Sequence, residues 1–281
     1  MAIPILYFML CMAVNYFIYS SQPPKLAKSR VLIAGDSHAE KSLNPWLFSS
    51  AENISQPAEP YFLTYWKIRN VLRYYSPDTI IVGFAHHNIS AFNDLKVGKH
   101  SWADEIFKRS YPFHQFHVID ELITVDLVGF YKVLFKHTAY YPNKNHVHYI
   151  GKYQNGDRND VSNWKSSINR HYYVNDSLHG VSKISLNYLD SIVALGQTYN
   201  VQIVLSGSPV YEEYFNHIPT SIKDEYELLK TRYSKSAIIF DQTADTTFPD
   251  SLMLDSDHLN AKGAKVYSTS LMQFLQSSRN E

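Results

Sequence analysis

Ser37 stands at a place in the chain where a serine side chain can do chemistry. It follows residues 30–34, an apolar run that leads into Gly35 and Asp36 and is typical of a buried strand followed by a turn. In open α/β sheets, ligands and reacting groups gather at the carboxyl ends of the strands. A serine at such a turn also lies near the positive end of the following helix, which favours a developing oxyanion. Because a serine hydroxyl is a weak nucleophile by itself, Ser37 requires a base.

A base is present near the C-terminus, where Asp255, Asp257 and His258 precede a helical pattern that starts at Asn260. A carboxylate three residues before a histidine can orient the ring through one nitrogen, which leaves the other nitrogen free to take a proton from a serine. Asp255 has this spacing, and Asp257, the residue directly before His258, competes for the same role. The residues therefore predict a serine, histidine and aspartate site of the kind that transfers acyl groups.

The two blocks, Gly35-Asp36-Ser37 and Asp255-x-x-His258, resemble the first and last motifs of the SGNH (GDSL-type) hydrolases. The resemblance runs from about residue 30 to about residue 275 and is strongest to a membrane-anchored bacterial branch that acts on cell-surface glycans or their acyl groups. It implies a flavodoxin-like α/β fold and a catalytic triad of Ser37, His258 and Asp255, since the family spacing favours Asp255 over Asp257. It also implies a serine esterase or O-acyltransferase that acts on ester-linked acyl groups of a glycan, with no metal and no cofactor.

The same family forms an oxyanion hole from the backbone N–H of its serine and from two middle blocks. Ser55 stands where the first of these blocks has a glycine, and its N–H is the expected donor beside that of Ser37. The second block is Gly-x-Asn, and here Asn88 follows Gly83 by five positions instead of two. Asn88 is the predicted side-chain donor, with His86 or His87 as the alternative that points into the site.

Alternating strand and helix patterns predict a doubly wound, mainly parallel α/β sheet flanked by helices. Apolar runs that end in Gly, Ser or Asp predict four strands, at residues 30–34, 78–83, 201–207 and 236–241. Helical spacing of apolar side chains predicts four helices, at residues 61–75, 181–199, 221–233 and 261–276. Residues 95–176 fit the alternation poorly and are interpreted as an insertion over the substrate side, with a helix at 118–135.

The N-terminal segment predicts a membrane helix. Residues 2–19 are apolar apart from Asn15, and 18 residues of helix span roughly 27 Å, close to a hydrocarbon core. The expected organisation is an anchor or uncleaved signal at 1–20, a linker at 21–29 and a hydrolase-like domain at 30–281. A buried core helix and a cleaved signal peptide are the alternatives.

The side of the membrane on which the domain lies has two interpretations. The family resemblance implies a periplasmic or extracellular domain. Lys25, Lys28 and Arg30 follow the apolar segment, and the positive-inside rule would place the domain in the cytoplasm.

Composition excludes several classes of protein. Lys+Arg and Asp+Glu are 26 each in 281 residues, and this neutral balance argues against a nucleic-acid partner. One cysteine excludes an internal disulfide framework and a cysteine-rich zinc site. The expected partners are an acylated glycan or another ester substrate and a membrane; the sequence predicts no oligomeric state.

Two other functions fit part of the pattern. Asp36-Ser37-His38 matches the Asp-x-His opening of metallophosphoesterases, but the chain lacks the Gly-Asp-x-x-Asp and Gly-Asn-His blocks that complete a two-metal site. The departures from the family at Ser55 and Asn88 keep a non-catalytic glycan-binding or assembly module as the alternative to an enzyme.

Overall fold

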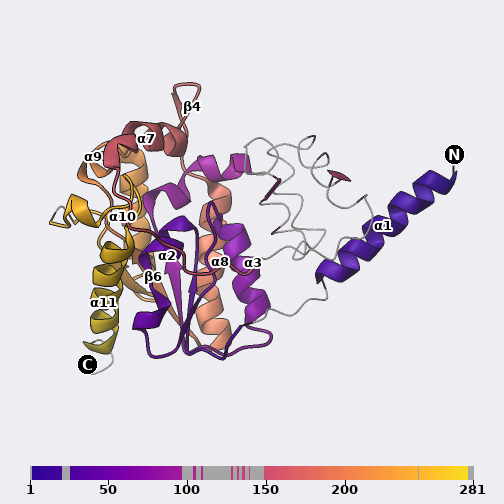
Figure 1. The fold of residues 1–281 in the computed structure, drawn as a ribbon, viewed down its shortest axis with the longest axis horizontal. Helices are drawn as coiled ribbons and strands as arrows, with labels where there is room; N and C mark the ends of the chain where they lie inside the picture. The colour runs from indigo at the N-terminus through magenta and orange to yellow at the C-terminus, as the bar shows by residue number, and fades with distance from the viewer. Residues whose placement is uncertain are drawn as a thin grey trace.

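A five-stranded parallel sheet forms the centre of the protein in a computed structural model (Figure 1). The structure describes residues 2–20, 26–96, 104, 105, 109, 128, 132, 135, 136, 139, 149–245 and 247–277. The strands are β1 (Val31–Ala34), β2 (Ala51–Asn53), β3 (Thr79–Gly83), β6 (Gln202–Gly207) and β7 (Ile238–Asp241). Their order is β2-β1-β3-β6-β7, and each neighbouring pair is parallel. This is a doubly wound, flavodoxin-like order, in which the direction of winding reverses beside β1.

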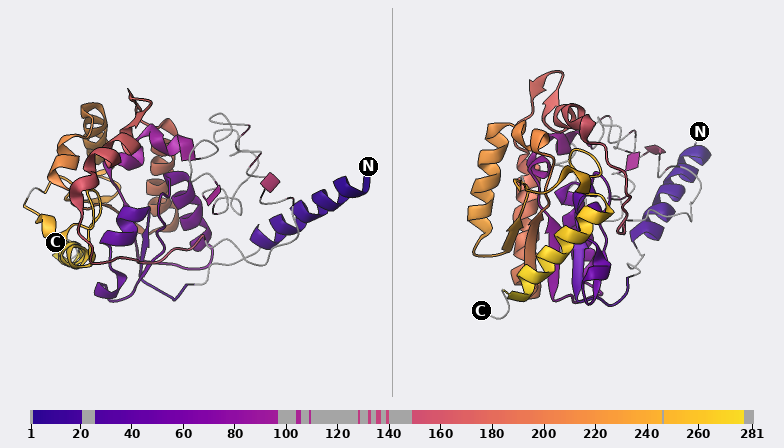
Figure 2. Two further views of the ribbon diagram at one scale, coloured as in Figure 1. Left: turned by 45° about the horizontal axis from the view of Figure 1, so that its top comes forward. Right: turned by 60° about the vertical axis from the view of Figure 1, so that its left-hand side comes forward.

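Helices cover both faces of the sheet (Figures 1 and 2). One apolar cluster joins alternate strand residues such as Leu32, Ile80 and Leu205 to α3 (Tyr61–Val71), α8 (Lys183–Tyr199) and α10 (Thr220–Tyr233). A second cluster joins Ile33 and Ile81 to α2 (Ser37–Ser42) and α11 (Ala261–Ser277). Successive strand residues face opposite layers, so these strands are buried on both sides and need apolar residues at every position.

The four predicted strands and four predicted helices are all present. The sequence patterns did not predict β2, which has only three residues and is recognised by its parallel pairing with Val31–Ile33 of β1. Also missed were short elements near the site: α7 (Trp164–Tyr172), α9 (Glu212–Asn216) and the hairpin of β4 (Tyr173–Val174) and β5 (Ser177–Leu178). The 3₁₀ turns are η1 (Pro45–Leu47), η2 (His86–Ile89), η3 (Ala91–Lys96), η5 (Val161–Asn163) and η6 (Asp250–Leu252).

The expected insertion at 95–176 is described in part. Its second half contains η5, α7 and β4, and α7 contacts η3 and α9 at the carboxyl edge of the sheet. Most of residues 97–148, and with them most of the helix predicted at 118–135, lie outside the described residues.

The N-terminal segment forms the helix α1 (Ala2–Ser20), as its apolar composition predicted. In the part of the chain that the structure describes, however, no helix combines the length and apolar character needed to cross a membrane. The structure thus has the predicted helix within residues 1–20 but does not support the prediction that this helix crosses a membrane.

Candidate active site

The turn from β1 to α2 places Ser37 as the first residue of α2, at the carboxyl edge of the sheet. Gly35 makes this turn at φ +144°, a backbone conformation that residues with a Cβ rarely adopt. A Cβ on Gly35 would also lie 3.1 Å from the backbone N of Gly83 and 3.1 Å from Cβ of Ala39. The glycine therefore allows α2 to pack closely on the ends of β1 and β3.

The loop before α11 holds His258 in a fixed position. Met253 and Leu259 form an antiparallel bridge, and the Leu254 N–H donates to the His258 carbonyl at 2.8 Å. The Asn260 side chain accepts from the N–H groups of Lys262 (3.1 Å) and Gly263 (3.0 Å), and so caps α11 where the sequence predicted its start.

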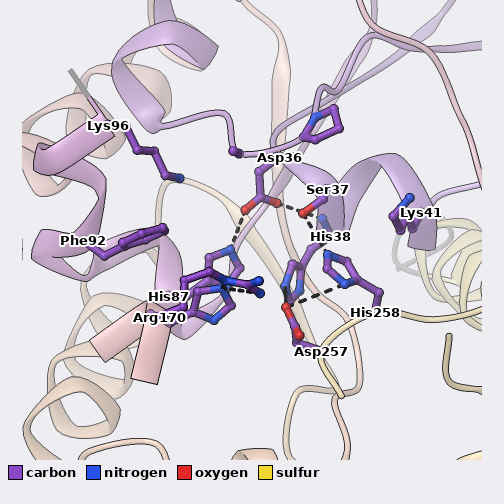
Figure 3. Close-up of a pocket in the computed structure, with 13 residues that line it drawn as sticks. Asp36, Ser37, His38, Lys41, His87, Phe92, Lys96, Arg170, Asp257 and His258 are labelled. Atoms are coloured by element: carbon purple, nitrogen blue, oxygen red, sulfur yellow. Dashed lines mark hydrogen bonds and ion pairs between the residues drawn. The ribbon is translucent and has the colours of Figure 1, made fainter. Parts of the chain in front are cut away.

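Ser37, His258 and Asp255 lie in one hydrogen-bonded line (Figure 3 labels the first two). The distance from Ser37 Oγ to His258 Nε2 is 2.8 Å. His258 Nδ1 lies 2.8 Å from Asp255 Oδ1 and 3.1 Å from Asp255 Oδ2. Asp255 Oδ1 also accepts from the His258 N–H at 3.0 Å, which fixes the carboxylate in its turn. Because Nδ1 donates to Asp255, Nε2 can accept the serine proton.

Asp257 is the second carboxylate beside His258. Its Oδ2 lies 3.7 Å from His258 Nδ1 and 3.4 Å from His38 Nε2, and its side chain is 1% exposed. Burial disfavours the imidazolium of His258, but the Asp257 charge and the bonded Asp255 outweigh burial and raise the pKa of His258 to about 9. The charge of His258 and the contact with His38 hold the pKa of Asp257 well below its usual value despite its burial. Asp255 therefore orients the ring, while Asp257 adds charge behind it.

Asp36 is a buried hub that ties the ends of β1 and β3 together. Its Oδ1 accepts from the His38 N–H at 3.0 Å, and its Oδ2 lies 2.5 Å from His87 Nε2 and accepts from Asn88 Nδ2 at 2.7 Å. Burial would raise the pKa of Asp36, but the charge and hydrogen bond of His87 keep it well below its usual value. Asn88, the predicted oxyanion donor, directs one of its two amide N–H groups to Asp36, and its role as a donor stays a prediction. Asn88 is also absent from the walls of the pocket that contains Ser37.

The N–H of Ser55, the predicted backbone donor, also has a partner within the protein. This N–H donates to Asn53 Oδ1 at 3.0 Å, and Ser55 does not line the pocket. Ala58, three residues later, lines it and has φ +57°, in the left-handed region where glycine is favoured. Within the described residues, the Ala58 N–H has no hydrogen-bond acceptor. The sequence analysis did not identify Ala58 because Ala58 lies three residues after the position where the family has its glycine. The sequence feature that could have indicated it is a proline, Pro57, followed by a small residue.

Four histidine rings form a row through the site. The ring centroids of His258 and His38 are 4.7 Å apart, those of His38 and His87 are 4.2 Å apart, and those of His87 and His171 are 4.9 Å apart. Of the two histidines named as alternatives to Asn88, His87 lines the pocket. His86 stacks on Tyr226 and does not line the pocket. Burial and the neighbouring His38 lower the pKa of His87 to about 4. Two rings of this row thus have opposite shifts, since the pKa of His258 is raised and that of His87 is lowered.

The pocket in front of Ser37 has a volume of about 280 Å³. Its walls are Asp36, Ser37, His38, Lys41, Pro57, Ala58, His87, Phe92, Lys96, Arg170, His171, Asp257 and His258. Sequence reasoning missed Lys96 and Arg170, because η3 and α7 reach the pocket from the region interpreted as an insertion.

The described residues contain one group with the geometry of a metal site. The ligand atoms of His38, Asp257 and His258 all lie within 4.8 Å of one another. Both ring nitrogens of His258 already have partners, Asp255 on Nδ1 and Ser37 on Nε2. A metal at His258 would replace one of these partners, so this group and the serine line compete for one imidazole.

Comparison with known proteins gives folds of low similarity. No family model and no curated protein matches the chain. A candidate acylhydrolase from Bacteroides fragilis has a TM-score of 0.43 at 12% identity, covering 94% of this chain and 97% of its own. A candidate platelet activating factor from Streptococcus pneumonia has a TM-score of 0.43 at 14% identity, covering 96% and 94%. A gut microbial diltiazem-metabolizing enzyme has a TM-score of 0.42 at 10% identity, covering 91% of this chain and 48% of its own. Structural similarity at this level does not establish an activity for the chain.

Proposed function

We propose that the protein is a serine esterase of the SGNH type, with Ser37 as nucleophile, His258 as general base and Asp255 as the group that orients His258. The observation that carries the proposal is the continuous line from Ser37 Oγ through His258 to Asp255, with 2.8 Å at each contact. A nucleophile bonded to a base that is itself oriented by a third group is the signature of covalent acyl transfer.

The reaction begins when Ser37 Oγ attacks the carbonyl carbon of an ester while its proton passes to His258 Nε2. The resulting imidazolium is stabilised by Asp255 on Nδ1 and by the nearby charge of Asp257. The developing oxyanion is held by the N–H groups of Ser37 and Ala58, which both line the pocket. His258 then protonates the leaving alcohol, and the acyl group remains on Ser37.

In the second half of the reaction, water attacks the acyl-enzyme and gives its proton to His258. The tetrahedral intermediate collapses to release a carboxylic acid and the free serine. The proposed substrate is an acylated glycan, and a sugar hydroxyl that replaced water in this step would make the protein an O-acyltransferase. Ser37, His258 and Asp255 would have the same roles whether water or a sugar hydroxyl accepts the acyl group.

The test is direct capture of the acyl-enzyme. The full chain is mixed with 4-nitrophenyl acetate, quenched in acid within seconds and weighed intact, with peptide mapping of the acetyl group. We expect one acetyl group on Ser37 in the wild type and none in Ser37→Ala. Turnover of the ester with no serine adduct would overturn the covalent mechanism, and a folded protein with neither would favour the glycan-binding module. Adding a glycan acceptor then separates the two enzyme types by their products, free acetate or acetylated sugar.

A further inference from the structure

Two cations that line the Ser37 pocket have no carboxylate within ion-pair distance among the described residues. Lys96, at the end of η3, is 1% exposed, and its Nζ donates to the neutral Asn93 Oδ1 at 2.6 Å. An ammonium group has three donors, so two remain. Among the described residues, no carboxylate lies within ion-pair distance of Lys96. A buried charge is costly unless it is paired, so an unpaired ammonium in a pocket wall indicates a missing anion.

Arg170, on α7, is the second cation of the pocket wall, and unlike Lys96 it is exposed. Its Nε lies 3.3 Å from His171 Nε2 and its Nη2 lies 3.5 Å from Ser167 Oγ, and both of these acceptors are neutral groups. A guanidinium has five N–H donors in a planar fork that matches carboxylate, sulfate and phosphate oxygens. Arg170 therefore retains donors for an anion in the pocket.

The nearby acidic groups are already engaged. Asp36 is bound by His87, Asn88 and the His38 N–H, and Asp257 lies against His38 and His258. Neither forms an ion pair with Lys96 or Arg170 among the described residues. Burial lowers the pKa of Lys96 to about 8, although the charges of Asp36 and Glu59 favour its ammonium form from beyond ion-pair distance. An anion in the pocket would give Lys96 a direct partner.

The fold holds Lys96 in place before any ligand binds. Asn93 Nδ2 donates to the carbonyls of His87 (2.8 Å), Asn88 (3.1 Å) and Ser90 (3.1 Å), while Asn93 Oδ1 accepts from Lys96. The ammonium also lies 4.8 Å from the centre of the Phe92 ring. Figure 3 shows Lys96, Phe92 and Arg170 on the side of the pocket away from Lys41 and His258. An apolar ring beside a fixed ammonium and an exposed guanidinium is suited to a ligand that carries a charge beside an apolar surface.

We propose that Lys96 and Arg170 form a subsite for an anionic group of the substrate, so that the preferred ester bears a carboxylate, sulfate or phosphate. This inference rests on the proposed esterase function, because it concerns the substrate of the same pocket. The anion belongs either to the acyl group or to the alcohol, for example a uronic acid in an acylated glycan. Both arrangements place one negative group between Lys96 and Arg170 while the ester carbonyl meets Ser37.

The test compares matched pairs of esters on the full chain. The first pair is 4-nitrophenyl hexanoate and mono-4-nitrophenyl hexanedioate, which differ by a terminal carboxylate on the acyl side. The second pair is an O-acetylated methyl glucoside and the corresponding O-acetylated uronate, which differ by a carboxylate on the alcohol side. A charged hydrogen bond contributes about 1.5–3 kcal/mol, so we expect kcat/KM for the anionic member of one pair to be at least tenfold higher.

Variants assign the preference to the two cations. In Lys96→Met and Arg170→Gln, the ratio of anionic to neutral kcat/KM should fall at least fivefold, while Lys96→Arg should keep most of it. Lys165→Met is the matched control, because Lys165 is an exposed lysine on α7 that lies over Trp164 as Lys96 lies over Phe92. A ratio near one in the wild type for both pairs, or a preference that survives in both variants, would overturn the subsite.

Calorimetric titration of Ser37→Ala with the same four compounds separates the subsite from the esterase function. Selective binding of an anionic member, weakened by Lys96→Met, supports the subsite even if no ester is turned over. Turnover of neutral esters with no anion-selective binding rejects the subsite and leaves the esterase function intact. Absence of both rejects both proposals.

Discussion

The carboxylate of Asp257 lies 3.7 Å from Nδ1 of His258, beyond the 2.8 Å hydrogen bond that this nitrogen makes with Asp255. The two aspartates thus have different relations to one ring. Asp255 is bonded and 29% exposed, whereas Asp257 is 1% exposed and acts on the ring through its charge. Both favour the imidazolium, and together they set the pH at which His258 becomes a base.

The pH dependence of activity follows from this arrangement. His258 accepts the Ser37 proton only when it is neutral, and its pKa of about 9 makes it mostly protonated at neutral pH. The value of kcat/KM should therefore rise with pH, by about tenfold per pH unit well below this pKa, and level off above about pH 9. Initial rates with a neutral ester between pH 6 and about pH 10, corrected for spontaneous hydrolysis, measure the profile.

Replacing Asp257 should move that profile. In Asp257→Asn the buried charge that raises the pKa of His258 is removed, so the rising limb should shift toward lower pH while Asp255 still orients the ring. Asp176→Asn, at an exposed aspartate far from the pocket walls, serves as the control and should keep the wild-type profile. A limb that stays in place in Asp257→Asn would show that this carboxylate does not act on His258.

Much of this fold could be predicted from sequence, for a physical reason. Residues buried on both faces of a parallel sheet must be apolar throughout, so β1, β3, β6 and β7 appear as continuous apolar runs. β2 has the sequence Ala-Glu-Asn and shows no such run, because it is a short edge strand. Ser37, Asp255 and His258 were found because each is fixed by its own local turn.

The remaining site residues depend on partners distant in sequence. Asn88 faces Asp36, 52 residues away, and no local pattern shows that its amide is already used. Lys96 and Arg170 reach the pocket through packing of η3 against α7, which a residue pattern does not specify. The predicted membrane span rested on the apolar composition and the length of residues 2–19, and no helix among the described residues is long and apolar enough for one.

Asn88→Ala distinguishes a structural role from an oxyanion role. Removing the amide leaves the buried Asp36 carboxylate one donor short, which should lower the free energy of unfolding by about 1–3 kcal/mol. Denaturant unfolding measures this loss, with the exposed Asn187→Ala on α8 as the control that should unfold like the wild type. A fall of kcat by roughly 10²–10³ at unchanged stability would instead support Asn88 as an oxyanion donor.

Ala58 should tolerate glycine but not a β-branched residue. Its φ of +57° is accessible to glycine without strain, so Ala58→Gly should retain kcat and stability close to the wild type. Valine at this φ is strongly disfavoured, and Ala58→Val should displace the N–H and lower kcat by up to roughly 10²–10³. Steady-state kinetics of the two variants, checked by circular dichroism for folding, make the comparison. Equal kcat in both folded variants would remove the Ala58 N–H from the mechanism.

Chelation tests which chemistry uses His258. In the serine mechanism its ring nitrogens are bound to Asp255 and Ser37, so ester hydrolysis should be unchanged after dialysis against EDTA. A divalent ion seated on His38, Asp257 and His258 would take Nδ1 from Asp255, and added zinc should therefore inhibit if it binds there. Loss of activity on chelation, with recovery on adding a divalent metal, would support the metal-dependent alternative.

The most direct test of the central claim is the intact mass of the protein after treatment with a fluorophosphonate, which phosphonylates an activated serine as fluoride leaves. The wild type should gain the mass of one phosphonyl group, mapped to Ser37. Ser37→Ala should gain none, and His258→Ala should react much more slowly, since its serine lacks the base 2.8 Å away. A folded wild-type protein that gains no adduct, or gains it equally in His258→Ala, would contradict the proposal that His258 activates Ser37.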